Sequence, residues 1–377
     1  MKFRKKSKTT LILFYILVSY ASIPFFIGLE SSRSSPSQNI RPLESLNGLD
    51  ELESNLDDKT EMNTEIFSGI SEKYDKELQT FLTELKVDDE CCESGEIKTI
   101  VMFDKAISKI QRLNVLQSHF DNFEVIYNYD IISGAYIRID PYELIDAETE
   151  IMEITGITKI YKSQTFTQPV ITEDAEDNKL NSIIPSALDK ADYSNWWLSA
   201  IGADGLTEDG SGVKIAIIDS GVYDHPGLTI SESENFVSED STTNDLNGHG
   251  THCAGIAAGN GDGSDGKFRG IAPGAEIINA RAADSFGALD DGDIISAIQW
   301  ADGRADIISM SFGGGQPAAY DPITAAIDSA VDAGVICVVS SGNSGPEYFT
   351  GGSPAVGTDA IAVGATNSAD ELASFSS

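Results

Sequence analysis

Two polar side chains follow predicted strands, at the positions where α/β folds gather their chemistry. Asp219 comes directly after the apolar run 213–218, and an ionised carboxylate beside a buried strand is costly unless a partner pairs with it. Asn343 lies in a glycine-rich turn after the apolar run 335–339, so its side-chain amide can donate a hydrogen bond into a cleft. Taken singly, each residue is equally consistent with an ordinary turn position.

Two histidines, His249 and His252, lie in the segment 247–255, whose sequence is NGHGTHCAG. Its glycines allow a close backbone approach at the start of a helix, which places His249 at the helix entrance, where an imidazole can act as a base. A metal site is the alternative, but zinc needs a third and usually a fourth ligand, and no carboxylate or cysteine stands at the spacing of a His-Glu-x-x-His motif. The pattern favours His249 as a general base and His252 as a structural residue.

The elements that must position these residues are predicted from hydrophobic runs in the last half of the chain. Continuous apolar runs, typical of buried parallel strands, cover residues 213–218, 275–280, 307–310 and 335–339. Helices are expected over 251–258, 292–301 and 322–333. The alternation predicts a doubly wound, mostly parallel α/β domain over 196–377, with its chemistry at the carboxyl ends of the strands.

A smaller α+β module is expected over residues 96–162. Predicted strands cover 97–103, 123–129, 134–139 and 157–161, and predicted helices cover 105–118 and the segment that begins at Asp140-Pro141. The order β-α-β-β-α-β is the ferredoxin-like arrangement. Nothing in this module has a pattern typical of catalysis.

The N-terminal segment 1–29 is typical of an exported protein, with a basic start followed by the apolar run 11–29. The run predicts either a cleaved signal peptide or an uncleaved membrane anchor, because its length just reaches that of a membrane span. In both cases the rest of the chain is expected to be secreted or otherwise extracytoplasmic. Residues 30–95 are expected to form an acidic linker with one amphipathic helix over 64–86, and residues 163–195 an exposed acidic linker.

The charge balance is strongly acidic. The chain has 25 Lys and Arg residues against 60 Asp and Glu residues, for a net charge of −35, which excludes nucleic-acid binding through a basic face. Residues 196–377 hold 5 basic and 26 acidic residues. Such a surface favours solubility in salt or cation binding.

Ordered motifs in residues 196–377 resemble those of the subtilisin-like serine proteases, the subtilase family. The matching segments, in family order, are VKIAIIDSGV, NGHGTHCAGIAAG, GIAPGAEI, DIISMSFGG, VVSSGNSGP and AIAVGATN followed by ASFSS. The segment 96–162 resembles the inhibitory propeptide of the same family in position and strand order. The resemblance implies a peptidase that needs no cofactor for catalysis, acts on polypeptides and is inhibited by its own propeptide until cleavage within 163–195.

The resemblance also assigns roles to individual residues. Asp219 matches the aspartate that orients the imidazole, His249 the general base and Asn343 the side-chain donor of the oxyanion hole. The residues that match the substrate-binding segments and the walls of the specificity pocket are Gly287, Ala288, Leu289, Ser311, Phe312, Gly313, Ser340, Ser341, Gly342 and Gly352. Ser353-Pro354 aligns with a proline that the family often holds in the cis form.

Two departures from the family pattern affect the expectations. The loop 260–270 differs from the family's calcium-ligand loop, so a structural Ca²⁺ is expected at most at a different site, which Asp262 and Asp265 could serve. The sequence also ends at Ser377, before the Gly-Thr-Ser helix start that carries the nucleophile in the family.

Two hypotheses follow from the second departure. The first is a secreted endopeptidase whose sequence is cut short, and the second is a non-enzymatic peptide-binding or regulatory protein without the nucleophile. Under the first, residues 1–377 alone are expected to be inactive, because His249 has no hydroxyl to deprotonate. A membrane partner is expected only if the N-terminal segment stays uncleaved.

Overall fold

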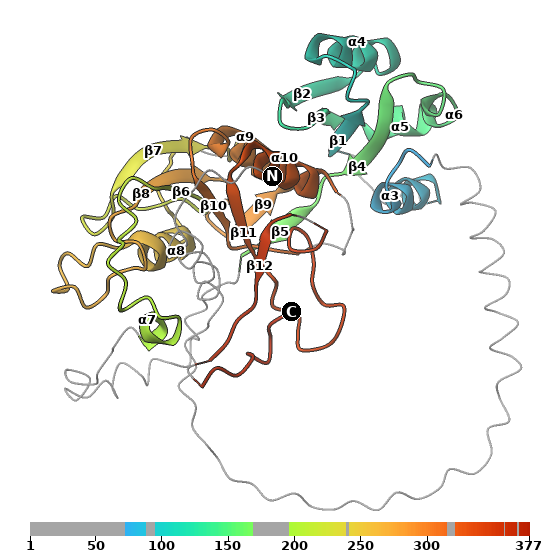
Figure 1. The fold of residues 1–377 in the computed structure, drawn as a ribbon. Helices are drawn as coiled ribbons and strands as arrows, with labels where there is room; N and C mark the ends of the chain where they lie inside the picture. Colours follow the sequence, from blue (N-terminus) through green and yellow to red (C-terminus); the bar gives the residue numbers. More distant parts are fainter. Residues whose placement is uncertain are drawn as a thin grey trace, which may run out of the picture. The chain divides into compact units, whose positions relative to one another are not determined.

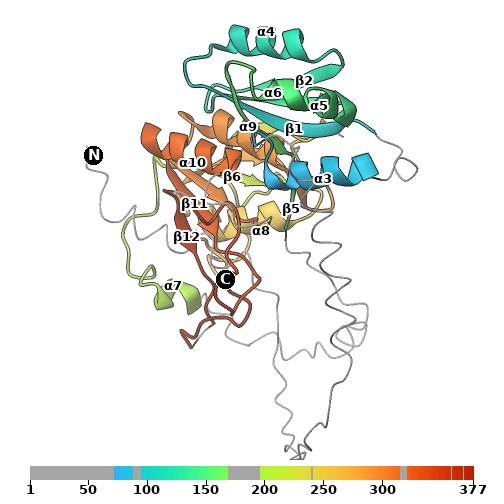
Figure 2. The same cartoon turned by 90° about the vertical axis from the view of Figure 1, so that its right-hand side faces the viewer.

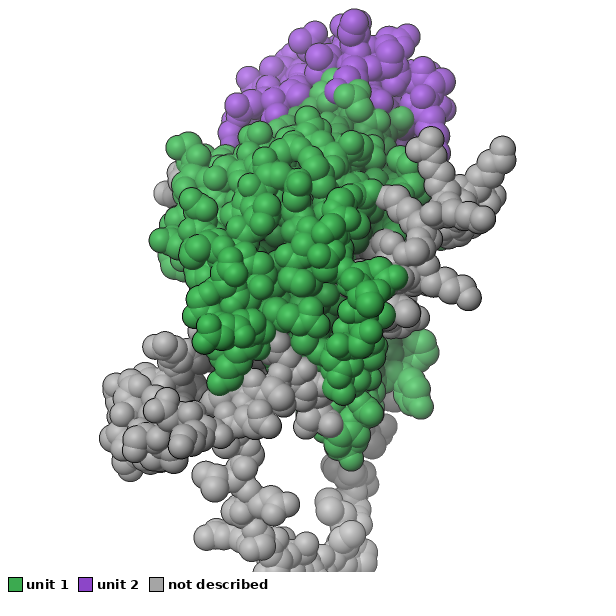
Figure 3. Space-filling model, turned by 60° about the vertical axis from the view of Figure 1, so that its left-hand side comes forward, with its two compact units in different colours: residues 1–24, 127–136, 163–377 green, residues 25–126, 137–162 purple. Residues whose placement is uncertain are grey.

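The computed structural model describes residues 72–87, 95–168, 196–238, 241–314, 321–357, 359–367 and 369–377 (Figure 1, Figure 2). The described residues group into two units (Figure 3). The larger unit comprises 163–377 together with the hairpin tip 127–136, and the smaller comprises the remainder up to residue 162. The expected signal or anchor 1–29, most of the linker 30–95 and residues 169–195 lie outside the described residues. No helix in the described part of the chain combines the length and apolar character needed to cross a membrane.

The larger unit is built on a six-stranded parallel sheet with the order β12-β11-β10-β6-β8-β7. Its strands are β6 (Lys214–Asp219), β7 (Ile230–Asn235), β8 (Glu276–Arg281), β10 (Ile307–Met310), β11 (Ile336–Ser340) and β12 (Ile361–Val363). From β6 the chain forms β7 and then β8 on one side of that strand, and it crosses afterwards to β10 on the other side. The switch in direction therefore lies at β6, where doubly wound sheets open a crevice beyond their carboxyl ends.

Helices cover both faces of this sheet, as Figure 2 shows for α8 on one side and α9 and α10 on the other. The helices of this unit are α7 (Trp196–Ala200), α8 (His249–Ala258), α9 (Asp291–Ala301) and α10 (Pro322–Ala333). Small side chains of α8, among them Ala254 and Ala257, pack with Ile215, Ile217 and Ile277 in one buried cluster. The predicted α/β class is confirmed.

The segment that follows residue 162 differs from the exposed linker expected over 163–195. Strand β5 (Thr165–Thr167) pairs antiparallel with β9 (Ala288–Asp290). Phe166 is buried, with its ring edge-on to that of Phe312 at a centroid distance of 6.5 Å. The start of the expected linker is thus wrong, because an apolar side chain and a strand edge are available to hold it.

The smaller unit holds a four-stranded sheet with the order β2-β3-β1-β4, flanked by helices. The elements are α3 (Lys76–Val87), β1 (Ile97–Phe103), α4 (Lys109–His119), β2 (Phe123–Asn128), β3 (Gly134–Ile139), α5 (Pro141–Asp146), α6 (Glu148–Ile151) and β4 (Ile157–Lys162). Strand β4 runs antiparallel to β1. Helix α4 begins four residues later than predicted, because Ser108 and Gln111 form a reciprocal capping box at its start.

Candidate active site

Asp219 and His249 form a buried pair at the carboxyl end of β6. The imidazole Nδ1 of His249 lies 2.9 Å from Oδ1 and 3.0 Å from Oδ2 of Asp219, and each residue is 1% exposed. Strand β6 is an apolar run that ends in this aspartate, and α8 begins at this histidine. Two elements that the sequence predicted separately are therefore brought together at the switch point of the sheet.

A glycine next to the histidine allows this approach. A Cβ at Gly250 would lie 2.1 Å from the carbonyl oxygen of Gly221 and 3.0 Å from Oδ1 of Asp219. The backbone of α8 thus passes directly over the carboxylate. Any side chain at position 250 would push the helix away and separate His249 from its partner.

Two further side chains hold the start of α8, and the sequence analysis did not identify them. Asp245 accepts hydrogen bonds from the backbone N–H groups of Gly248 and Thr251 and from the hydroxyl of Ser220. Ser220 in turn accepts the N–H of Gly250. Burial alone would raise the pKa of Asp245, but these and neighbouring donors lower it overall. An acidic residue shortly before a Gly-His helix start was the signal that could have revealed this cap.

The electrostatics of the pair favour a charged imidazole. Burial by itself would lower the pKa of His249, but the adjacent Asp219 carboxylate outweighs it and raises that pKa above its usual range. The thiol of Cys253 lies 3.8 Å from the same Nδ1, and burial raises the pKa of this thiol. Asp219 can therefore orient the ring through Nδ1 and stabilise its protonated form.

The metal alternatives receive little support from the geometry. Asp219, His249 and Cys253 place ligand atoms within 4.8 Å of one another, but the carboxylate already accepts the imidazole N–H. His252 is exposed and does not join this group. Within the described ranges, Asp262 and Asp265 belong to no group of three carboxylate, imidazole or thiolate ligands. Both are exposed, so these two residues alone do not fit a closed Ca²⁺ cage, and an ion there stays a prediction.

The residues predicted to bind substrate line one cavity of about 290 Å³. Its walls include Asn343 and the predicted positions Ser311, Phe312, Gly313, Ser340, Ser341, Gly342 and Gly352. The hydroxyl of Ser340 donates to the carbonyl of Phe312 at 3.0 Å and ties two of these segments together. The Ser353–Pro354 peptide bond beside the cavity is cis, as the sequence predicted.

The remaining predicted positions, Gly287, Ala288 and Leu289, lie along the opposite rim, where β9 pairs with β5. Thr167 pairs with Ala288 in this ladder and also bridges to Gly313 across the cleft. The next residue, Gln168, continues this pairing, because its backbone N–H donates to the carbonyl of Gly287 at 2.9 Å. The chain's own segment 165–168 therefore occupies the cleft as an added antiparallel strand.

Gln168 connects this strand to the buried pair. Its side-chain amide donates to Oδ1 of Asp219 at 2.6 Å, and the residue is 4% exposed. Gln168 also lines the 290 Å³ cavity with Thr167. This contact could not be predicted from the sequence, since a polar residue in an apparent linker has no periodic pattern.

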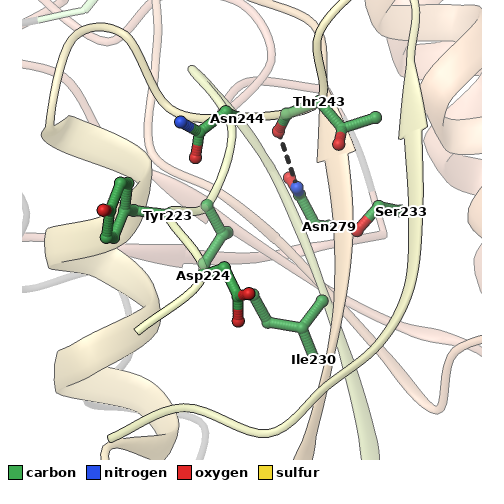
Figure 4. Close-up of a pocket in the computed structure, with 8 residues that line it drawn as sticks. Tyr223, Asp224, Ile230, Ser233, Thr243, Asn244 and Asn279 are labelled. Atoms are coloured by element: carbon green, nitrogen blue, oxygen red, sulfur yellow. Dashed lines mark hydrogen bonds between the residues drawn. The ribbon is translucent and has the colours of Figure 1, made fainter. Parts of the chain in front are cut away.

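A second hollow, of about 600 Å³, lies beside β7 and β8 and contains none of these residues (Figure 4). Its lining includes Tyr223, Asp224 and Asn244. Nδ2 of Asn279 donates to the carbonyl of Thr243 at 2.8 Å. Oδ1 of Asn279 is buried with no hydrogen-bond partner among the described residues.

Comparisons with known proteins place this geometry in context. The sequence profile of the Subtilase family matches residues 210–377. Serine protease AprX of Bacillus subtilis is 36% identical over 219 residues, which are 52% of this chain and 49% of AprX. Subtilisin BL of Lederbergia lenta is 40% identical over 190 residues, which are 48% of this chain and 66% of that protein. The chain spans about half the length of the first curated relatives that it matches.

A solved structure supports the same fold. Fervidolysin of Fervidobacterium pennivorans superposes with a TM-score of 0.53 at 23% identity, over 76% of this chain and 46% of fervidolysin. The matched residues 210–377 include both members of the buried pair, Asp219 at the end of β6 and His249 at the start of α8. Residues 210–377 therefore match the Subtilase family in sequence, and the described fold is shared with a subtilisin-related structure.

Proposed function

We propose that this protein is a secreted serine endopeptidase that cleaves polypeptides bound as an extra strand beside β9. The observation that carries the proposal is the buried Asp219–His249 pair next to a cleft in which a peptide segment already lies in extended, strand-paired form. Strand addition supplies affinity through main-chain hydrogen bonds, whatever the side chains. A cleft of this kind suits a peptidase that acts on unfolded or extended chains.

In the proposed mechanism Asp219 fixes the tautomer of His249 and stabilises its charged form. Nε2 of His249 takes the proton of a serine hydroxyl, and Nδ2 of Asn343 donates to the oxyanion of the tetrahedral intermediate. The serine itself is proposed to lie beyond Ser377, in a continuation of the chain. The reaction takes no cofactor, and any Ca²⁺ bound near Asp262 and Asp265 would serve the fold.

We further propose that the segment 165–168 is an intramolecular inhibitor. It fills the cleft, and Gln168 donates to the carboxylate that His249 uses. Release of this block requires cleavage downstream, within residues 169–195, and removal of residues 96–168. Export through the N-terminal segment 1–29, as a signal peptide or an anchor, belongs to the same proposal.

A serine-directed fluorophosphonate probe tests the proposal. The chain of 377 residues and a form extended through the continuation of its gene are both incubated with the probe. Labelling of the extended form, abolished by His249→Ala and retained by His252→Ala, is the expected result. An extended form that carries a Gly-Thr-Ser segment and is not labelled would contradict the peptidase and leave a peptide-binding protein.

A further inference from the structure

Asp291 is a buried carboxylate that faces the chain segment in the cleft rather than the protein core. It is the first residue of α9, directly after β9, and is 5% exposed. Its backbone N–H donates to the carbonyl of Gln164 at 3.1 Å. Its Oδ2 accepts the backbone N–H of Gln164 at 3.1 Å, and its Oδ1 accepts the hydroxyl of Ser163 at 2.6 Å.

These contacts extend the peptide-binding cleft by one residue beyond the ladder between β5 and β9. The ladder between β5 and β9 pairs Thr165 with Asp290, and Gln164 would be next in register. Strand β9 ends there because α9 begins, so no further strand edge is available. The Asp291 carboxylate accepts the backbone N–H of Gln164 in place of the missing ladder carbonyl. It also accepts a hydrogen bond from the hydroxyl of Ser163, the residue before Gln164.

In the uncleaved chain this site also lies beside Tyr136. The Tyr136 ring covers the start of α9 so closely that a Cβ at Gly292 would lie 2.2 Å from it. The Tyr136 hydroxyl lies 3.4 Å from the hydroxyl of Ser163. Because Tyr136 belongs to the segment 96–168 that is proposed to be removed, selection in the mature form depends on the Asp291 carboxylate and the hydroxyl that it binds.

Burial makes the charged form of the Asp291 carboxylate costly at this position. Burial raises the pKa of Asp291 to about 7, against hydrogen bonds from Ser163 and Gln164 that lower it. The neighbouring Asp290 also raises this pKa. A buried carboxylate that loses its donors is left with an uncompensated desolvation cost, so it discriminates against segments that lack them.

We propose that Asp291 is a specificity-determining residue of the cleft. It selects peptide segments that carry serine or threonine five positions ahead of the residue that contacts Asp219, through the hydroxyl and the following backbone N–H. This inference rests on the proposed peptidase function. The recognised ligand is an extended polypeptide of at least six residues, of which Ser163–Gln168 is the example within this chain.

Peptide substrates of the extended form test the selection. A parent peptide that begins Ser-Gln-Thr-Phe-Thr-Gln and continues with the chain's own sequence is compared with versions that start with Thr or Ala. Hydrogen bonds to a charged group are worth about 1.5–3 kcal/mol, so KM should rise about 10-fold or more for Ala, with kcat unchanged and Thr equal to Ser. Asp291→Asn should remove most of the difference between Ser and Ala, and Asp293→Asn should preserve it. Equal KM values for Ser and Ala would overturn the proposal.

A second measurement separates this inference from the proposed function. If the extended form hydrolyses none of the peptides, the peptidase proposal fails, and hydrogen exchange of the 377-residue chain decides on Asp291. Ser163→Ala and Asp291→Asn should each lower the protection of the Gln164 amide, and the double variant should lose no more than Asp291→Asn alone. Ser163→Thr should retain protection. Additive losses, or no loss from Ser163→Ala, would refute the role of Asp291.

Discussion

Burial determines what the Asp219 carboxylate does to the imidazole of His249. Both side chains are 1% exposed, and the attraction between two charges grows as water is excluded from around them. The N–H of Ser220 also donates to Oδ1 of Asp219 at 2.7 Å, and so does the Gln168 amide. The carboxylate therefore accepts hydrogen bonds from several donors besides the imidazole.

Replacement of Asp219 by asparagine should lower the pKa of His249. In the native chain this pKa is raised, so the contribution of His249 to folding stability is complete below 6.5, its ordinary value, and is lost as the pH rises through the folded pKa. Asp219→Asn removes the carboxylate and leaves the burial, which brings the pKa to 6.5 or below. Titration of the His249 Cε1 proton by NMR measures it.

The control for this titration is Asp224→Asn, which removes an exposed aspartate five residues further along the chain. It should leave the His249 titration where it is in the native protein. An Asp219→Asn variant in which the imidazole still keeps its proton well above pH 7 would contradict the electrostatic account of the pair.

The position of His249 depends on how helix α8 begins. The N-cap residue, Gly248, makes no side-chain cap hydrogen bond, and Asp245 supplies the acceptor from three residues upstream. The same carboxylate accepts the hydroxyl of Ser220, which follows β6. One side chain therefore fixes the start of the helix relative to the end of the strand.

Asp245→Ala should destabilise the larger unit by about 1–2 kcal/mol at pH 7, the usual cost of losing a helix cap. Because the folded pKa of Asp245 is lowered, its contribution is present above its ordinary value of 3.8 and is lost as the pH falls through the folded pKa. Urea unfolding at pH 7 and near pH 3 measures both effects. A destabilisation that is the same at the two pH values would contradict the charged cap.

The strand β5 is held in the cleft mainly by Phe166. This side chain is 2% exposed and pairs with Leu289, whereas Thr165 and Thr167 on either side are exposed. Phe166→Ala should cost about 2 kcal/mol of docking free energy and lower the hydrogen-exchange protection of segment 163–168 roughly 30-fold. Phe166→Leu should retain most of it. Equal protection in Phe166→Ala and native chains would show that main-chain pairing alone holds the strand.

The sequence predicted elements well where hydrophobic patterning determines them. The run 307–310 and the helix 322–333 have the predicted bounds, since a buried strand and a capped amphipathic helix leave clear patterns. Strand β7 was missed because its sequence, ISESEN, is polar, as an edge strand paired on one side can be. Asp219 and His249 were predicted from local motifs, but Gln168 and Asp291 act across more than 50 residues of chain and leave no local signal.

The molecule as a whole carries a net charge of −35, and residues 196–377 contribute 26 acidic against 5 basic residues. Like charges repel in the compact state, and this repulsion is screened as the Debye length falls from about 30 Å at 0.01 M salt to about 3 Å at 1 M. Dissolved salt, which screens charges, and a specifically bound cation stabilise such a surface in different ways. Screening depends on ionic strength alone, whereas a bound cation acts through its own affinity.

The unfolding midpoint of the chain in urea should therefore rise steadily between 0.01 and 1 M NaCl. KCl at equal ionic strength should give the same rise, because screening does not depend on the identity of the cation. A further rise with millimolar CaCl₂ at constant ionic strength would favour the cation site predicted at Asp262 and Asp265. A midpoint that falls or stays constant with NaCl would contradict the role of self-repulsion.

Peptide-bond hydrolysis by this protein is proposed to depend on the Asp219–His249 pair. The most direct measurement is kcat/KM of the extended form on a peptide that begins Ser-Gln-Thr-Phe-Thr-Gln, for the native protein, His249→Ala and His252→Ala. Removal of the base from a subtilisin triad costs about 10⁶-fold in kcat, so His249→Ala should lower kcat by a factor of that order relative to the native protein. His252→Ala, on the same helix, should keep most of the native rate. Comparable losses from both variants, or turnover that survives His249→Ala, would contradict the account.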